Sequence, residues 1–212
     1  MSGAIGVCPK GVGVIGETLD DQLVRTALTY LDGESAERLS MRQVAQANGV
    51  SHQAPYVHFG SKRRFLAAVA SVGLQEATDA VIAALGDAGD DPLTRLHAFA
   101  DAYMSFIQTR PHVHDLAFGP LVAKGDHPLL QQAAAHHWDL LHDTVARCQP
   151  PGTGEAEILR RCVASWGTVY GIARLGALRQ IPDAVPGDGV ELTHQALDAL
   201  YLGWQAESPD VG

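Results

Sequence analysis

Apolar residues recur at spacings of three and four along most of the chain, which is the pattern of amphipathic helices. In the segment 20–31 this stripe consists of Leu23, Ala27, Leu28 and Leu31. No run of alternating apolar and polar residues between hairpin turns appears, so no strand is expected. The pattern therefore predicts an all-α protein.

Turn-forming residues divide the pattern into three short helices, one long helix and a series of further helices. The expected ranges are 20–31, 41–48, 52–59, 62–85, 92–110, 111–121, 129–148, 155–179 and 190–205. Ser40 is expected to cap the second helix with Gln43 as its capping-box partner, and Gly49 to end it in the left-handed conformation. Ser51 is expected to cap the third helix.

The second and third expected helices, joined by Asn-Gly-Val-Ser at 48–51, form a helix-turn-helix pattern. In this motif the second helix enters the major groove of DNA, and side chains of its first turns meet base edges. His52 and Gln53 are the candidates for reading bases, because Gln pairs bidentately with adenine and His reaches the acceptors of guanine. Double-stranded DNA is therefore the predicted partner of this part of the chain.

Four side chains near these helices are candidates for phosphate contacts. Lys62 combines a cation with the backbone N–H donors at the start of the long helix, a pair that suits a phosphate oxygen. Arg42, Ser51 and Tyr56 are the other three. A solvated surface lysine and a packed tyrosine ring are the alternatives for Lys62 and Tyr56.

The run GVSHQAPYVHFGSK at 49–62 resembles the signature of the TetR family of one-component bacterial regulators. In that family a Tyr-x-x-Phe element closes the recognition helix and a Lys opens the long connecting helix. Tyr56, Phe59 and Lys62 stand in those places, and the resemblance covers about 23–69. It implies a DNA-binding domain followed by a larger domain for ligand binding and dimerisation, with Tyr56 on a phosphate.

Two further runs narrow the resemblance. APYVHF at 54–59 and Trp-x-x-x-Tyr-Gly at 166–171 are similar to the subgroup named for a Trp-His-Gly C-terminal domain. Tyr170 stands where the His of that subgroup would be.

Composition excludes several classes of protein. With 212 residues, 46% of them hydrophobic and 18% charged, the chain has the content of a folded globular protein and not of a disordered one. No window reaches about 18 uninterrupted apolar residues, so no membrane partner is predicted. Cys8, Cys148 and Cys162 contain no CxxC pair, and the Gly-rich start lacks the order of a secretory signal, which together favour the reducing cytoplasm.

Charge divides the chain into two parts. Residues 1–64 carry seven Lys and Arg against six acids, whereas residues 65–212 carry eight against eighteen. A near-neutral head with cations clustered at its end, on an acidic body, indicates an anionic partner for the head alone. The expected division is a flexible segment at 1–16, a DNA-binding domain at 17–64 and a ligand-binding and dimerisation domain at 65–212.

The body is rich in aromatic side chains with a few polar tips, which suit a pocket for a small apolar or aromatic effector. The candidate lining residues are Phe99, Tyr103, Phe106, His114, Phe118, Trp138, His142, Trp166 and Tyr170. An ordinary packed core is the alternative for each of them.

Catalytic and metal sites are not predicted. The six histidines between His112 and His142 are poorly spaced for a metal ion on helices, and no nucleophile elbow, P-loop, dinucleotide fingerprint or His-Glu-x-x-His motif occurs. No cofactor is expected. The alternative function is an all-helical enzyme or a small-molecule-binding protein that uses the same pocket.

The last two helices are predicted to form a homodimer interface. Gly167, Gly171 and Gly176 leave a surface on which another helix can approach closely, and the final helix is apolar on two sides. The resulting hypothesis is a repressor that binds a palindromic operator as a homodimer and is released by an effector.

Overall fold

The computed structural model describes residues 17–122, 125 and 127–206, and these residues form helices with no strand. The all-α prediction is confirmed, while the expected flexible segment at 1–16 lies outside the described residues. The helices are α1 Leu19–Leu31, α2 Met41–Ala47, α3 Ala54–Phe59, α4 Lys62–Asp87, α5 Pro92–Thr109, α6 Pro111–Phe118, α7 Pro128–Arg147, α8 Glu155–Ala177 and α9 Gly189–Ala206.

The ends of α2 follow the local signals in the sequence. The Ser40 hydroxyl accepts a hydrogen bond from the backbone N–H of Gln43 at 3.4 Å, as an N-cap residue does. Gly49 has φ +67°, a backbone conformation that glycine adopts without the steric penalty of a Cβ. The sharp turn after α2 is therefore built as predicted.

The start of α3 differs from the prediction. The helix begins at Ala54 and not at His52, and the Ser51 side chain does not cap it. Pro55 has no N–H, so it cannot make the α-helical bond to the carbonyl of Ser51. That carbonyl accepts from the N–H of Ala54 at 2.9 Å instead, which closes a tight turn. His52 and Gln53 consequently lie in a turn in front of the helix.

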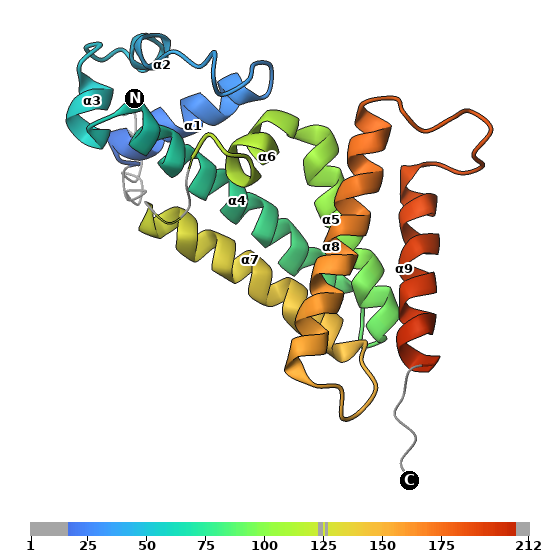
Figure 1. Ribbon diagram of the computed structural model, residues 1–212. Helices are drawn as coiled ribbons and strands as arrows, with labels where there is room; N and C mark the ends of the chain where they lie inside the picture. The colour runs from blue at the N-terminus through green and yellow to red at the C-terminus, as the bar shows by residue number, and fades with distance from the viewer. Residues whose placement is uncertain (1–16, 123–124, 126, 207–212) are drawn as a thin grey trace, which may run out of the picture.

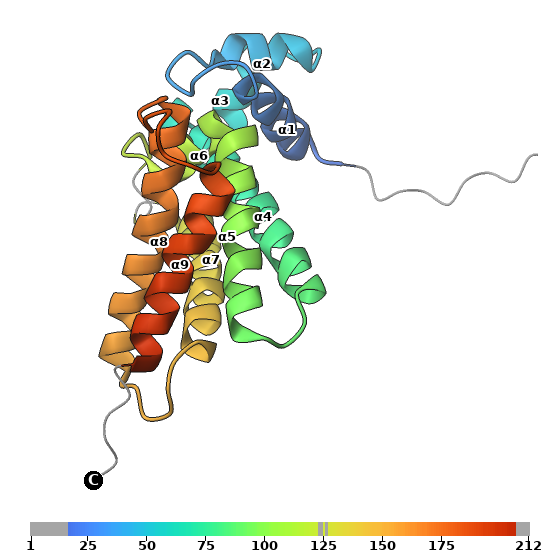
Figure 2. The ribbon, with the colours of Figure 1, turned by 90° about the vertical axis from the view of Figure 1, so that its right-hand side faces the viewer.

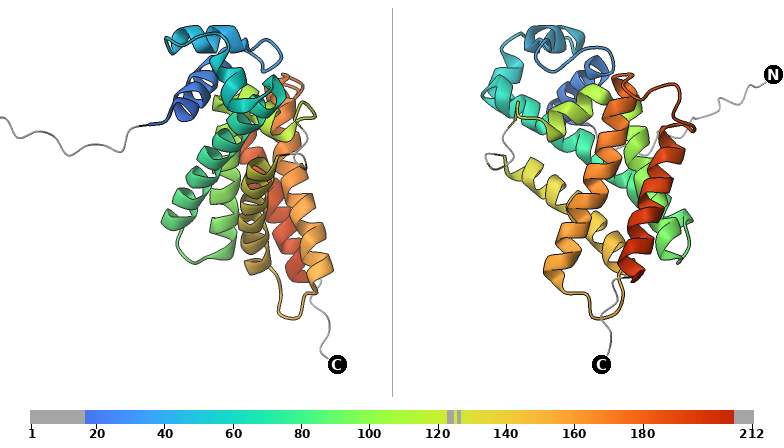
Figure 3. Two further views of the ribbon diagram at one scale, coloured as in Figure 1. Left: turned by 90° about the vertical axis from the view of Figure 1, so that its left-hand side faces the viewer. Right: turned by 45° about the vertical axis from the view of Figure 1, so that its right-hand side comes forward.

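Helices α1 to α3 form a head at one end of the molecule, and α4 runs from this head into the body (Figure 1). Helices α5 to α9 make up the rest of the body. The long helices α8 and α9 lie side by side along one flank (Figure 2), and the head sits beyond the ends of the body helices in the other views as well (Figure 3). This arrangement of an N-terminal helix-turn-helix head and a helical body is the predicted fold class.

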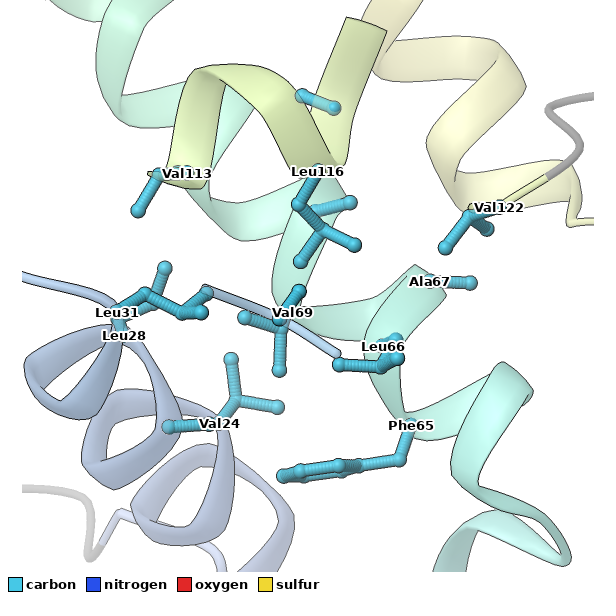
Figure 4. Close-up of a cluster of buried hydrophobic side chains, with 14 of the residues drawn as sticks. Val24, Leu28, Leu31, Phe65, Leu66, Ala67, Val69, Val113, Leu116 and Val122 are labelled. Atoms are coloured by element: carbon cyan, nitrogen blue, oxygen red, sulfur yellow. The ribbon is translucent and has the colours of Figure 1, made fainter. Parts of the chain in front are cut away.

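Two clusters of buried side chains hold the fold together, and α4 belongs to both. The first joins α1, the N-terminal half of α4 and α6, with Leu28, Phe65, Val69 and Val113 among its members (Figure 4). The second joins the C-terminal end of α4 to the body helices. Its members include Val81, Leu96, Leu141, Val169 and Leu197. The predicted division at 64/65 falls within the helix that links the clusters, and it stays a prediction.

Helix α4 is long and apolar enough by composition to cross a membrane. Of its most apolar window, 56% is buried inside the structure, against α1, α5, α6 and α7. The apolar length of α4 is therefore explained by its place in the two cores.

Gly73 of α4 lies directly against Val113 of α6. The residue is buried, and a Cβ added to it would overlap Cγ1 of Val113 on α6. Val113 is fully buried and branched at Cβ, so it has little freedom to move aside. The missing side chain at position 73 is what lets the two helices pack at this distance.

We expect Gly73→Ala to lower the free energy of unfolding by about 1–3 kcal/mol, because the added methyl overpacks the contact with Val113. Gly86→Ala is the matched control on the same helix, where a new Cβ would have no neighbour within 4 Å. It should leave stability unchanged or raise it by about 0.5–1 kcal/mol. Urea unfolding followed by circular dichroism measures both, and equal effects of the two substitutions would contradict the packing argument.

Candidate functional site

The residues predicted to contact DNA gather on the outer surface of the head. Five of them are exposed to solvent: Arg42, Ser51, His52, Gln53 and Tyr56. Arg42 lies in the first turn of α2, and the other four lie in the turn before α3 and at its start. The helix-turn-helix thus presents polar side chains of the predicted types on a surface that other parts of the described chain leave open.

Internal contacts hold this surface in shape. The Asn48 side-chain amide donates to the Thr26 hydroxyl at 2.9 Å and to the Val44 carbonyl at 2.8 Å, which ties the turn after α2 to α1. The Phe59 ring packs edge-to-face on Phe65, with ring centroids 4.9 Å apart. Phe59, the Phe of the Tyr-x-x-Phe element, is thus a packing residue of the head.

Val57 is a residue of this surface that the sequence analysis missed. Its side chain is 79% exposed on α3, directly after Tyr56. An exposed apolar group beside base-reading candidates suits the methyl group of thymine. Its position next to Tyr56 in the motif was the signal that could have revealed it.

Lys62 is placed differently from the five exposed residues. It begins α4, as predicted, but it is half-buried and its ammonium group donates to the backbone carbonyl of Glu37 at 3.0 Å. The Ser61 hydroxyl accepts from the N–H of Arg64 at 3.2 Å and caps the helix. Lys62 therefore links the start of α4 to the loop between α1 and α2.

Two neighbouring cavities in the body have walls rich in aromatic side chains. The first, of about 340 Å³, opens between α6 and α8 and is lined by His114, Asp115, Phe118, Gly119, Val163, Trp166, Gly167 and Tyr170. The second, of about 350 Å³, opens between α5, α7 and α8 and is lined mainly by Phe99, Tyr103, Ala134, His137, Trp138 and Leu141. Phe118 and Trp166 line both cavities, so their rings form the partition between them.

Most of the predicted pocket residues line one of these cavities. Seven do so: Phe99, Tyr103, His114, Phe118, Trp138, Trp166 and Tyr170. Phe106 does not, because it packs in the first core and meets the pocket only through the edge of His114. His142 does not either, since its Nε2 atom lies 3.0 Å from a carboxylate oxygen of Glu155 at the α7–α8 junction.

A chain of hydrogen bonds runs through the walls of these two cavities. The indole N–H of Trp166 donates to the hydroxyl oxygen of Tyr103 at 2.8 Å. The Tyr103 hydroxyl lies 3.0 Å from Nε2 of His114, and its own proton is free to be donated there. Burial raises the pKa of Tyr103 above its ordinary value of 10, so the hydroxyl keeps that proton. The three buried polar groups thus satisfy one another.

The chain continues to the mouth of the first cavity. The other ring nitrogen of His114, Nδ1, lies 3.5 Å from a carboxylate oxygen of Asp115. The same oxygen lies 3.2 Å from a guanidinium nitrogen of Arg174. Asp115 is the one acidic side chain among the described residues that line these two cavities. The guanidinium group of Arg174 balances its charge.

These walls suit an uncharged ligand. Aromatic faces line both cavities, the Trp166 N–H and the Tyr103 hydroxyl are hydrogen-bonded to each other, and burying an unpaired charge there would carry a large desolvation penalty. Among the residues that the structure describes, no group of three or more His, Cys, Asp or Glu side chains is arranged to hold a metal ion. The body thus contains cavities with aromatic walls.

Comparison with known proteins agrees with this description. Residues 96–200 match the family model of the tetracyclin repressor-like C-terminal domain. A search of curated proteins found no match.

Solved structures share the fold over most of the chain. A protein with unknown function from Rhodococcus sp. RHA1 is 29% identical, with a TM-score of 0.77 over 90% of this chain and 97% of that chain. The TetR family transcriptional regulator PfmR from Thermus thermophilus is 20% identical, with a TM-score of 0.58 over 86% and 98%. The transcriptional regulator FadR from Bacillus subtilis, solved in complex with stearoyl-CoA, is 12% identical, with a TM-score of 0.65 over 86% and 97%.

The chain belongs to the TetR family, and it is a transcriptional regulator and not an enzyme. The match at residues 96–200 thereby confirms the family that the run at 49–62 predicted. The subgroup with a Trp-His-Gly C-terminal domain stays a prediction.

Tyr103→Phe should lower the free energy of unfolding by about 1–3 kcal/mol, because it leaves the Trp166 N–H and the His114 Nε2 without the hydroxyl that pairs them. Tyr170→Phe is the matched control, since Tyr170 lines the neighbouring first cavity and is 39% exposed. It should change stability by less than about 0.5 kcal/mol. Urea unfolding measures both, and an equal loss in the control would show that the paired hydroxyl is not the cause.

Proposed function

We propose that this regulator is a repressor that binds a palindromic operator as a homodimer in the cytoplasm, and that a small uncharged apolar or aromatic effector releases it. The observation that carries the proposal is the placement of α4. Its first residue is the phosphate candidate Lys62 in the head, and its C-terminal end packs in the core that backs the pocket. A single rigid helix therefore joins the two candidate sites.

The proposed DNA contacts rest on exposure and chemistry. Gln53 and His52 are exposed where a recognition helix begins, with donor and acceptor groups that match base edges in the major groove. Arg42, Ser51 and Tyr56 flank them and supply groups for phosphates. In this proposal Lys62 exchanges its bond to the Glu37 carbonyl for a phosphate oxygen, which is the stronger, charge-assisted partner.

The proposed homodimer rests on the flank formed by α8 and α9. Large apolar side chains that one copy leaves exposed lie along these two helices and directly after α8: Leu159, Val163, Leu175, Leu178 and Leu202. Gly167 on α8 and Gly203 on α9 are exposed and have open space at the position of a Cβ. A two-fold partner that places its own α8 and α9 on this flank would bury the apolar groups in a four-helix interface.

The proposed effector follows from the walls of the cavities. Each cavity is large enough for a ligand of one or two fused rings, at the lower end of the volumes of small-molecule sites. FadR, which has the same fold, was solved with stearoyl-CoA, so this fold accommodates a ligand with a long apolar chain. Binding that changes the angle of α4 would alter the separation of the two heads, and successive grooves would no longer be matched.

Selection from random duplexes with the full-length dimer should return an inverted repeat whose half-sites lie about one helical turn, or a multiple, apart on one face of the DNA. Lys62→Ala should then weaken binding to all sequences. It should also make the slope of the logarithm of the binding constant against the logarithm of the salt concentration less steep by about one unit. Gln53→Ala should instead lose about 1–3 kcal/mol mainly at one base pair.

Fluorescence anisotropy on the selected operator and its single-base variants separates these two effects. Arg147→Gln at the exposed C-terminal end of α7 is the control and should change neither quantity. Selection without a palindrome would contradict the dimeric operator. Uniform losses in both head variants would contradict base reading by Gln53.

The uncharged probe N-phenyl-1-naphthylamine should bind the body and brighten, because aromatic walls exclude water from it. Ala134→Trp, which fills the cavity between α5, α7 and α8, should weaken this binding by about tenfold or more. Gln132→Trp, at an exposed position on the same helix, is the control. Titration by probe fluorescence measures both, and equal affinity in the two variants would place the ligand elsewhere.

A further inference from the structure

Arg110 lies where the pocket helices α5 and α6 meet. Its N–H donates to the carbonyl of Phe106 at 2.9 Å and ends α5, and its carbonyl accepts from the N–H of His114 at 3.0 Å and begins α6. Tyr103 lies two turns before it on α5, and His114 lies one turn after it on α6. A displacement of either pocket residue is therefore transmitted through the backbone at Arg110.

The side chain of Arg110 reaches away from the pocket and into the head. Its Nε atom lies 3.1 Å from a carboxylate oxygen of Asp32, the residue that caps the end of α1. One terminal nitrogen donates to the Leu28 carbonyl of α1 at 3.3 Å, and the other pairs with Glu76 on α4. The planar fork of a guanidinium makes these three bonds in fixed directions, which a lysine cannot do.

The packing of α6 against the head at this place is apolar. Val113 and Leu116 of α6 pack against Leu28 and Leu31 of α1 and against α4 (Figure 4). The burial of apolar surface has no preferred direction, so polar bonds of fixed direction add a separate constraint on the angle of the head. The Arg110 side chain is 25% exposed, whereas Asp32 and Glu76 are about half exposed. The guanidinium is thus the better shielded partner in this polar contact.

We infer that Arg110 is a positioning residue that sets the angle of the head on the body and thereby the half-site spacing that the dimer accepts. The inference rests on the proposed function, because a spacing exists only if the dimer binds a two-part operator. In a two-fold dimer the recognition elements must lie about 34–36 Å apart, or a multiple, to enter successive major grooves. A head that rotates on its body changes this distance, so a fixed angle gives selectivity for one spacing.

The same contact provides a route from the pocket to the DNA. His114 and Phe118 line the cavities on one side of α6, and Val113 packs against Gly73 on the other. A ligand that shifts α6 moves Arg110 with it, because the Arg110 carbonyl accepts the backbone bond that begins this helix. The bonds to Asp32 and Leu28 then carry the shift to α1.

The test compares full-length wild type with Arg110→Gln on a set of duplexes. Each duplex carries both selected half-sites with the spacer changed by about one or two base pairs, and one further duplex carries a single half-site. Wild type should bind the duplex with one spacing much more tightly than the others, and the ratio of these affinities is the spacing preference. Arg110→Gln should reduce this preference by about tenfold or more, while its affinity for the single half-site stays within about twofold of wild type.

Three further variants sharpen the comparison. Arg110→Lys retains the charge without the fork and should lose most of the preference. Asp32→Asn removes one partner from the other side and should lose part of it, and it tests the contact if Arg110→Gln does not fold. Arg147→Gln, which removes an exposed charge at the C-terminal end of α7, is the control and should behave as wild type.

The outcomes separate the two proposals. If wild type binds no duplex with two half-sites, the proposed function is wrong, and the inference falls with it. If wild type selects a spacing and both Arg110→Gln and Asp32→Asn select it equally well, the inference alone is wrong. If Arg110→Gln loses the same factor on the single half-site as on the full operator, Arg110 supports the fold of the head and does not set its angle, which also overturns the inference.

Discussion

The close packing of α6 against α4 at Gly73 is the contact on which the rest of this structure depends. Because Gly73 has no side chain, Val113 of α6 packs directly against the backbone of α4. Through this contact α6 belongs to the first core together with α1. The opposite side of α6 then forms the wall of the first cavity with His114 and Phe118. The head, the long helix and the pocket are thus connected through one helix of eight residues.

The pocket combines buried polar groups with aromatic walls. The Trp166 N–H, the Tyr103 hydroxyl and the Nε2 atom of His114 are linked by two hydrogen bonds. Such a network fixes the positions of the aromatic rings without supplying a charge for recognition. Selectivity must then come from the shape of two cavities that share a partition of Phe118 and Trp166. A ligand that crosses from one cavity to the other has to displace these rings.

Much of the fold was predictable because its signals are local. Caps, turns and the three- and four-residue spacing act over a few residues, and they placed α2, α4 and the turn at Gly49. The predicted start of α3 was two residues too early, because Pro55 cannot donate the helical hydrogen bond that a cap at Ser51 requires. The exposure of His52 and Gln53 followed from the motif, whereas the bond from Lys62 to the Glu37 carbonyl, between residues 25 apart, did not.

The sequence by itself determined the helices, the family and the residue types that the head presents, because each is encoded in a short run of the chain. The tertiary structure alone decided which aromatic residues surround a cavity. Phe106 and Phe99 look alike in the sequence, yet one packs in the first core and the other lines the pocket. The same holds for the bond between Tyr103 and Trp166, 63 residues apart, and for that between Arg110 and Asp32, 78 residues apart. Such pairs form only when helices pack at particular angles, and those angles depend on the shapes of many side chains at once.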